Sequence, residues 1–211
     1  MQEIHLLSGL GADQRVFNYL DLSDYKVNHI SWITPLNNES ITQYAGRLLE
    51  QIDSDHPILI GVSFGGTMAI ELGKLIQVKQ IILISSVETK WDLPFYYRMV
   101  GWWKLNKLIP SPFFKTVNAI TFWFFGIDTN EEKALLRAMI KDTDNTFLRW
   151  AIHQIVNLKN EVHLDNVVSI HGTSDRLLPH RDADFKIENG GHLMIINKAS
   201  EISKVIKRVI G

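Results

Sequence analysis

The sequence predicts a three-layer, doubly wound α/β sandwich built on a mostly parallel sheet of about six strands. Three observations favour this fold class. Short β-rich runs alternate with longer segments of helical period, several of the short runs are apolar throughout, and 211 residues suit a single α/β domain. Strands that are apolar on both faces belong to a sheet covered on both sides, and the β-α-β order makes neighbouring strands parallel.

The first half of the chain supplies four of the expected strands. They cover residues 4–7, 26–32, 57–61 and 80–84; the first ends at Ser8-Gly9 and the second stops before Pro35. A helix is expected over 40–52, where apolar residues recur at helical spacing, at Ile41, Tyr44, Ala45, Leu48, Leu49 and Ile52. A second helix is expected over 67–76, directly after the third strand.

The last fifty residues complete the alternation. Two further strands are expected over 166–170 and 183–188, and an amphipathic helix over 198–210 closes the chain.

The segment 88–160 interrupts this rhythm. It contains no convincing strand, yet it holds 14 of the 21 aromatic residues of the chain. The sequence therefore predicts a core made of residues 1–87 and 161–211, with a helical, aromatic-rich insertion over 88–160.

Composition excludes several classes of function. The 22 Lys and Arg balance 23 Asp and Glu, which argues against a nucleic-acid partner, and the absence of Cys rules out disulfides and thiol chemistry. No basic leader with a long apolar core and no apolar run of membrane-span length is present, so a cytoplasmic location without a membrane span is expected. His5, His153 and His163 lack metal-ligand spacing, and neither a metal nor a cofactor is expected.

One glycine-rich turn carries the first candidate for chemistry. Gly61-Val62-Ser63-Phe64-Gly65-Gly66 follows the third strand and opens a helix, which is the setting of a G-x-S-x-G nucleophile elbow. Small neighbours let the backbone turn tightly, so that the Ser63 hydroxyl is exposed above the sheet. The pattern alone also fits an ordinary glycine-rich turn that binds phosphate.

Two further motifs follow later strands. Asp175 lies in the His171–Pro179 segment after the fifth strand, and His192 follows Gly190-Gly191 after the sixth. Because the carboxyl ends of parallel strands meet at one edge of a sheet, Ser63, Asp175 and His192 are expected to converge there.

With these residues in this order, the chain resembles the α/β-hydrolase superfamily nearly from end to end. The resemblance implies that Ser63 attacks a carbonyl, that His192 takes the serine proton, and that Asp175 orients the imidazole. It assigns the oxyanion hole to the backbone N–H groups of Leu10 and Phe64. Relative to the family, the sheet is expected to lack its two leading strands and to have the order 2-1-3-4-5-6.

Two departures from the family pattern stand out. Ser8 occupies the position where many members have His before the oxyanion loop, which predicts altered hydrogen bonding in that loop. Asp175 and His192 are only 17 positions apart, so the helix that usually separates the last strands is expected to shrink to a turn after Pro179.

The resemblance makes the insertion 88–160 a helical lid. Its aromatic clusters would roof an apolar substrate pocket: Trp102-Trp103, Phe113-Phe114 and Phe122-Trp123-Phe124-Phe125. Two alternatives remain: the rings build the core of the insertion itself, or residues 122–127 form a patch that touches lipid.

The sequence thus predicts a serine hydrolase that cleaves a carboxylic ester or thioester of a small apolar substrate. The same triad could serve acyl transfer, C–C bond hydrolysis or a lyase step, and the same fold could serve a ligand receptor without catalysis. Haloalkane dehalogenase and epoxide hydrolase activities are disfavoured, since those relatives have Asp where this chain has Ser63.

Four other polar residues near these motifs have structural interpretations. Asp165 precedes the fifth strand and so lies at the wrong end for a triad, and His171 is expected to be packed or hydrogen-bonded at the strand end. Asp13 is expected to cap the turn that follows it rather than to line the pocket, and Arg176 to form a surface or structural ion pair.

Overall fold

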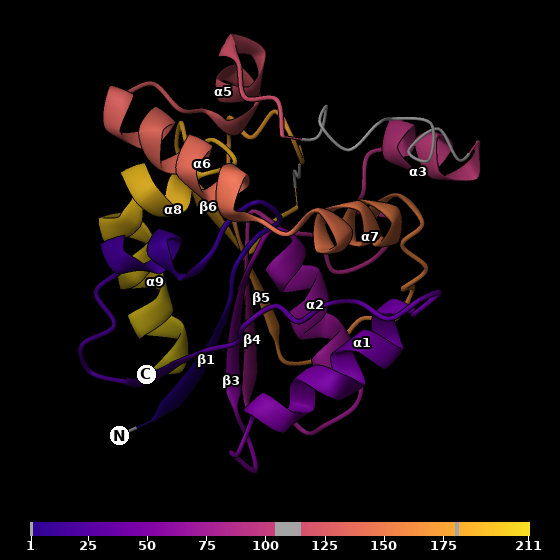
Figure 1. The fold of residues 1–211 in the computed structure, drawn as a ribbon. Helices are drawn as coiled ribbons and strands as arrows, with labels where there is room; N and C mark the ends of the chain where they lie inside the picture. Colours follow the sequence, from indigo (N-terminus) through magenta and orange to yellow (C-terminus); the bar gives the residue numbers. More distant parts are fainter. Residues whose placement is uncertain (1, 104–114, 180–181) are drawn as a thin grey trace.

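The computed structural model describes residues 2–103, 115–179 and 182–211. Their centre is a sheet of six parallel strands (Figure 1), which are β1 (Glu3–Leu7), β2 (Lys26–His29), β3 (Ile58–Val62), β4 (Gln80–Ile84), β5 (Val167–Gly172) and β6 (Phe185–Ile187). They lie side by side in the order β2-β1-β3-β4-β5-β6, so the predicted order 2-1-3-4-5-6 is confirmed.

Helices cover both faces of the sheet (Figure 1). On one side lie α1 (Ile41–Leu48), its 3-10 extension η2 (Leu49–Gln51) and α2 (Phe64–Gly73). On the other lie the 3-10 helix η1 (Gln14–Tyr19), α8 (Met194–Asn197) and α9 (Ala199–Ile210). The doubly wound, three-layer fold class is thereby confirmed.

Alternate residues of each central strand supply two separate cores. In β3, Ile58, Ile60 and Val62 pack toward η1, α8 and α9, whereas Leu59 packs toward α1 and α2. All five residues of β3 are buried. This two-sided burial is the physical reason why the strand sequences are apolar throughout rather than alternating.

The predicted boundaries were least accurate at the edges of the sheet. The strand expected over 26–32 ends at His29. Two of its four residues are exposed and two are partly buried, because β2 has a neighbouring strand on one side alone. The strand expected over 183–188 is limited to Phe185–Ile187, at the other edge. The helix expected over 67–76 begins three residues earlier, at Phe64.

The described residues of the insertion between β4 and β5 are mainly helical. They include α3 (Phe95–Trp102), α5 (Ala119–Phe125), α6 (Asn130–Asp142) and α7 (Asn145–Val156). Local sequence explains where they start, since the side chains of Asn118, Thr129 and Asp144 cap α5, α6 and α7. These described helices lie beyond the carboxyl ends of the strands (Figure 1).

Between β5 and β6 the described residues contain no helix, as the short spacing predicted. The described helices also include none that is both long and apolar enough to cross a membrane.

Candidate active site

Ser63 lies in the sharp turn between β3 and α2. Its backbone has φ of 51° and ψ of −120°, a conformation that a residue other than glycine rarely adopts. Hydrogen bonds of the Ser63 backbone hold the turn. The Ser63 N–H donates to the Ile84 carbonyl at 2.9 Å, and the Ser63 carbonyl accepts from the Ser86 hydroxyl at 2.6 Å. The turn thus presents the Ser63 side chain at the carboxyl edge of the sheet.

Asp175 and His192 meet Ser63 at this edge. The Nε2 atom of His192 lies 2.9 Å from the Ser63 hydroxyl oxygen, and its Nδ1 atom lies 2.8 Å from Oδ2 of Asp175. Because a carboxylate only accepts, Nδ1 carries the proton and Nε2 of the neutral ring accepts from Ser63. The structure therefore brings the three predicted residues together in one hydrogen-bonded chain.

Asp175 is buried but well supplied with donors. Its Oδ1 atom accepts hydrogen bonds from the backbone N–H groups of Leu177 and Leu178, both at 2.9 Å. Burial alone would raise the pKa of Asp175, but the positive charge of His192 in its protonated form and the hydrogen bonds from His171, His192 and Leu178 outweigh it. The pKa is held well below its usual range, so the carboxylate stays ionised at neutral pH.

The loop after β1 lies directly against Ser63. A Cβ placed on Gly9 would be 3.3 Å from Cβ of Ser63. Ser8 stabilises this loop, because its hydroxyl donates to the Ala12 carbonyl at 3.1 Å and accepts from the Trp32 indole at 3.0 Å.

Two backbone N–H groups beside Ser63 are available to a ligand. Within the described part of the chain, the N–H groups of Leu10 and Phe64 have no protein acceptor. Phe64 is the first residue of α2, and unpaired N–H groups at a helix start favour a negative charge. These are the two donors that the sequence predicted for an oxyanion.

No protein-family model and no curated protein sequence matches this chain. Solved structures do. An esterase from Exiguobacterium antarcticum aligns over 100% of this chain and 92% of its own, with a TM-score of 0.70 and 17% identity. A thermophilic esterase from Thermogutta terrifontis aligns over 100% and 89%, with a TM-score of 0.69 and 14% identity. An α/β hydrolase family protein from Desulfitobacterium hafniense aligns over 100% and 96%, with a TM-score of 0.64 and 16% identity.

The chain has the α/β-hydrolase fold. The likeness extends over the whole chain, so the insertion between β4 and β5 is included in it.

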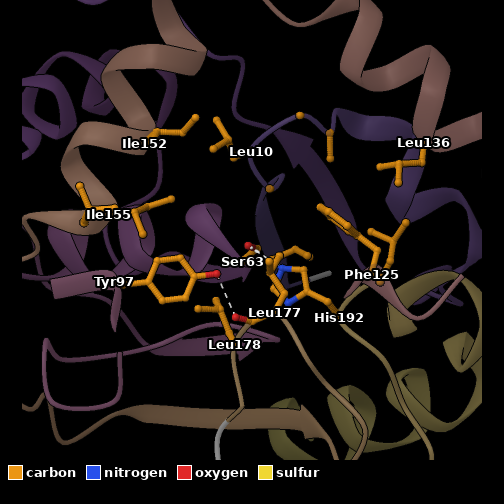
Figure 2. Close-up of a pocket in the computed structure, with 16 residues that line it drawn as sticks. Leu10, Ser63, Tyr97, Phe125, Leu136, Ile152, Ile155, Leu177, Leu178 and His192 are labelled. Atoms are coloured by element: carbon orange, nitrogen blue, oxygen red, sulfur yellow. Dashed lines mark hydrogen bonds between the residues drawn. The ribbon is translucent and has the colours of Figure 1, made fainter. Parts of the chain in front are cut away.

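In this α/β-hydrolase fold, residues of the insertion and of the core line a partly open cavity of about 190 Å³ at Ser63. Figure 2 shows Ser63 and His192 amid apolar side chains, with Leu10 and Ile152 on one side and Phe125 on another. Its further lining residues are Gly9, Gly11, Ala12, Val62, Tyr97, Leu136, Ile155, Val156, Leu177, Leu178 and Leu193.

The predicted aromatic roof is largely wrong. Of the clusters named for it, Phe125 lines the cavity, whereas Trp102 and Trp103 are 78% and 58% exposed. Phe113-Phe114 lies outside the described residues. Helix α3 packs on α7 through Gly101, where an added Cβ would be 2.0 Å from the Val156 carbonyl, and this close approach turns its tryptophans outward.

Other rings of the insertion pack against the α/β core. Trp150 of α7 lies 4.2 Å, centroid to centroid, from Tyr44 of α1, and Phe147 stacks on Trp32 at 5.0 Å. These two rings therefore join α7 to residues 1–87, whereas the alternative expectation was that the rings build the core of the insertion itself.

Sequence reasoning missed several side chains of the site. Ile152 and Ile155 line the cavity one helical turn apart on α7, a spacing that the sequence shows but that does not say which face points inward. Tyr97 of α3 donates from its hydroxyl to the Leu177 carbonyl at 3.0 Å, and burial raises the pKa of this hydroxyl. No pattern in the sequence links Tyr97 to the Asp175 loop.

Three of the remaining candidates have the structural roles expected of them. Asp13 caps η1 and pairs with Arg15, and Asp165 is exposed before β5. Arg176 differs from the expectation: it donates to the Trp123 carbonyl at 2.8 Å and forms no ion pair among the described residues. His171 is buried in β5, where it touches Asp175. No described group of three His, Asp or Glu side chains could hold a metal ion.

Proposed function

We propose that this protein is a serine hydrolase that cleaves carboxylic esters of small, uncharged, apolar substrates. One observation carries the proposal: the hydrogen-bonded chain from Ser63 through His192 to Asp175 ends in an apolar cavity. The two solved esterases with the same fold support ester cleavage as the reaction.

The reaction would proceed through an acyl-enzyme. As the Ser63 oxygen forms a bond to the ester carbonyl carbon, Nε2 of His192 takes the hydroxyl proton. The imidazolium then gives that proton to the leaving alcohol as the C–O ester bond breaks. A water molecule, deprotonated in turn by His192, attacks the acyl-enzyme and releases the carboxylic acid and the free Ser63 hydroxyl.

Charge develops on two groups during these steps, and each has a partner. Asp175, ionised and fixed by the N–H groups of Leu177 and Leu178, would stabilise the imidazolium. The unpaired N–H groups of Leu10 and Phe64 would donate to the oxyanion of the tetrahedral intermediate. Preorganised donors of this kind contribute roughly 3 kcal/mol each to transition-state stabilisation.

The cavity limits the substrate. An apolar cavity of about 150 Å³ holds a benzene molecule, so a cavity of about 190 Å³ suits a compact acyl, alkyl or aryl group. No Asp, Glu, Lys or Arg is among the described residues that line it, so a charged substrate group would lose its hydration without gaining a partner. We further propose that the insertion 88–160 acts as the lid over this group.

The first test is covalent labelling. A fluorophosphonate probe is expected to modify Ser63 of the folded wild type, located by peptide mass spectrometry. Failure of the probe to label any serine of the folded protein would refute the proposal.

A panel of p-nitrophenyl esters tests the substrate class. We expect kcat/KM to rise with acyl size up to the capacity of the cavity, then fall, and to be at least about tenfold lower for an acyl group that ends in a carboxylate. Ile152→Trp should shift the optimum to shorter acyl groups, because a larger side chain fills the cavity. Leu75→Trp, at an exposed position outside the cavity lining, is the matched control and should leave the optimum unchanged.

A further inference from the structure

A second histidine lies against the triad carboxylate. His171 is a residue of β5 and only 1% exposed. Its Nε2 atom lies 2.7 Å from the carbonyl oxygen of Leu178 and 3.1 Å from Oδ2 of Asp175. Both neighbours are acceptors, so Nε2 carries a proton that the two share, with the Leu178 carbonyl as the nearer acceptor.

Oδ2 of Asp175 is therefore close to two imidazoles. His192 approaches it at 2.8 Å through Nδ1, and His171 at 3.1 Å through Nε2. The other oxygen, Oδ1, is occupied by two backbone N–H groups. A hydrogen bond from His171 to Oδ2 partly neutralises this oxygen, so the oxygen attracts the ring of His192 less strongly.

The same histidine also closes the loop that carries Asp175. Leu178 donates its N–H to Oδ1 of Asp175 and accepts at its carbonyl from His171. The Leu178 side chain lines the cavity, and the neighbouring Leu177 carbonyl accepts from the Tyr97 hydroxyl. His171 thus connects the strand β5, the triad carboxylate and one wall of the cavity.

We propose that His171 is a positioning residue that fixes the orientation of Asp175 and weakens the electrostatic attraction between Asp175 and His192. It acts through Asp175 and does not touch the substrate. This inference rests on the proposed serine hydrolase function and adds a residue that sets the pH at which the triad becomes active.

The expected effect has a definite sign. Without the N–H of His171, Oδ2 carries more uncompensated charge and holds the imidazolium form of His192 more strongly. The neutral ring of His192 is the form that accepts the Ser63 proton. In a variant without the His171 donor, the acidic limb, meaning the low-pH side of the profile of rate against pH, should therefore move to higher pH.

Among the residues that the structure describes, few other ionisable groups face Asp175. Tyr96 and Tyr97 of α3 lie near enough for the negative charge of Asp175 to contribute to the raised pKa of their hydroxyls. Both hydroxyls therefore remain neutral in the relevant pH range. In β6 the residue in register with His171 is Lys186, which is exposed. The neighbouring residue after β4 is the uncharged Ser85.

The experiment compares two substitutions of His171. The rate of fluorophosphonate labelling of Ser63 is measured between pH 4.5 and 9 for the wild type, His171→Phe and His171→Gln. The phenyl ring keeps the bulk without a donor, so the acidic limb of His171→Phe should move up by roughly half a pH unit or more. The side-chain amide of Gln can donate again, so His171→Gln should keep the limb close to that of the wild type.

Controls separate this effect from a general loss of structure. His56→Phe, at an exposed position before β3 at the opposite edge of the sheet, should not change the limb. Circular dichroism establishes that each variant is folded. If His171→Phe does not fold, nitrogen-15 NMR of the histidine-labelled wild type, assigned with His171→Gln, should still show a proton on Nε2 of His171.

The outcomes distinguish the two proposals. A wild type that the probe does not label refutes the hydrolase function and this inference with it. Suppose that the probe labels the wild type, but that the acidic limb of folded His171→Phe lies at the same pH as that of the wild type or at a lower pH. That result refutes only the role of His171. The same holds if Nε2 of His171 carries no proton, or if His171→Gln shifts the limb as far as His171→Phe does.

Discussion

Replacing Ser63 by alanine is expected to lower kcat for a neutral p-nitrophenyl ester by a factor of about 10⁵ or more. The reason is chemical: without the hydroxyl no acyl-enzyme can form, and His192 and the oxyanion donors are left to act on water alone. The measurement is steady-state hydrolysis of the best ester from the acyl panel, with the uncatalysed rate subtracted.

The loss should not come from unfolding. The Ser63 hydroxyl bonds to His192, whereas the strained turn is held by its backbone N–H and carbonyl groups. Alanine keeps both backbone groups, so the melting temperature of Ser63→Ala should stay within a few degrees of that of the wild type. Ser200→Ala, at an exposed position in α9, is the matched control and should retain full activity. Substantial turnover by Ser63→Ala would show that another group is the nucleophile.

The site could be predicted from the sequence because topology does most of the positioning. Ser63 is far from Asp175 and His192 in the chain, but each of the three follows a strand, and parallel strands end at a common edge. Apolar runs identify the strands, and glycines identify the turns after them. Once the sheet order is correct, convergence of the three residues requires no knowledge of the side-chain packing.

The pocket wall could not be predicted in the same way. A helical period shows that α3 has an apolar stripe but does not say whether the stripe faces the cavity or solvent. In the structure Phe95, Met99 and Trp102 lie on an exposed face, because α3 meets α7 at Gly101. The aliphatic Ile152 and Ile155 of α7 line the cavity instead. Aromatic content therefore indicated an unusual insertion without indicating its inner surface.

The contact between His171 and Asp175 could also not be predicted from the sequence. A residue in β5 and a residue three positions past its end can adopt many relative orientations. Their 3.1 Å approach depends on a turn in which Asp175 accepts from the next residues along the chain. A local hydrogen-bonded turn of this kind is fixed by backbone angles that composition does not reveal.

Replacing Gly65 by alanine is expected to lower the free energy of unfolding by about 3 kcal/mol or more. Gly65 is the second residue of α2, next to the proposed nucleophile Ser63, where the helix crosses the end of β1. An added Cβ would lie 2.1 Å from the Leu7 carbonyl oxygen and 2.4 Å from that of Ser8. Both are backbone atoms, so the overlap cannot be relieved by a side-chain rotation, and α2 must move away from β1.

The same movement should impair catalysis in the molecules that remain folded. Ser63 and Phe64 belong to the start of α2, whereas Leu10 lies in the loop after β1, so separating the two elements pulls the expected oxyanion donors apart. Misplacement by about 1 Å can lower a rate about 100-fold. Urea denaturation gives the stability, and the rate of probe labelling per folded molecule gives the effect on the site.

Gly46→Ala is the matched control for this change. Gly46 is an exposed residue inside α1, and a Cβ added there meets nothing within 4 Å. Since alanine is the better helix former, this variant should be more stable than the wild type by about 0.5 to 1 kcal/mol, with unchanged labelling. A Gly65→Ala protein as stable and as reactive as the Gly46→Ala protein would contradict the close packing of α2 on β1, and with it the geometry assigned to the nucleophile and the oxyanion loop.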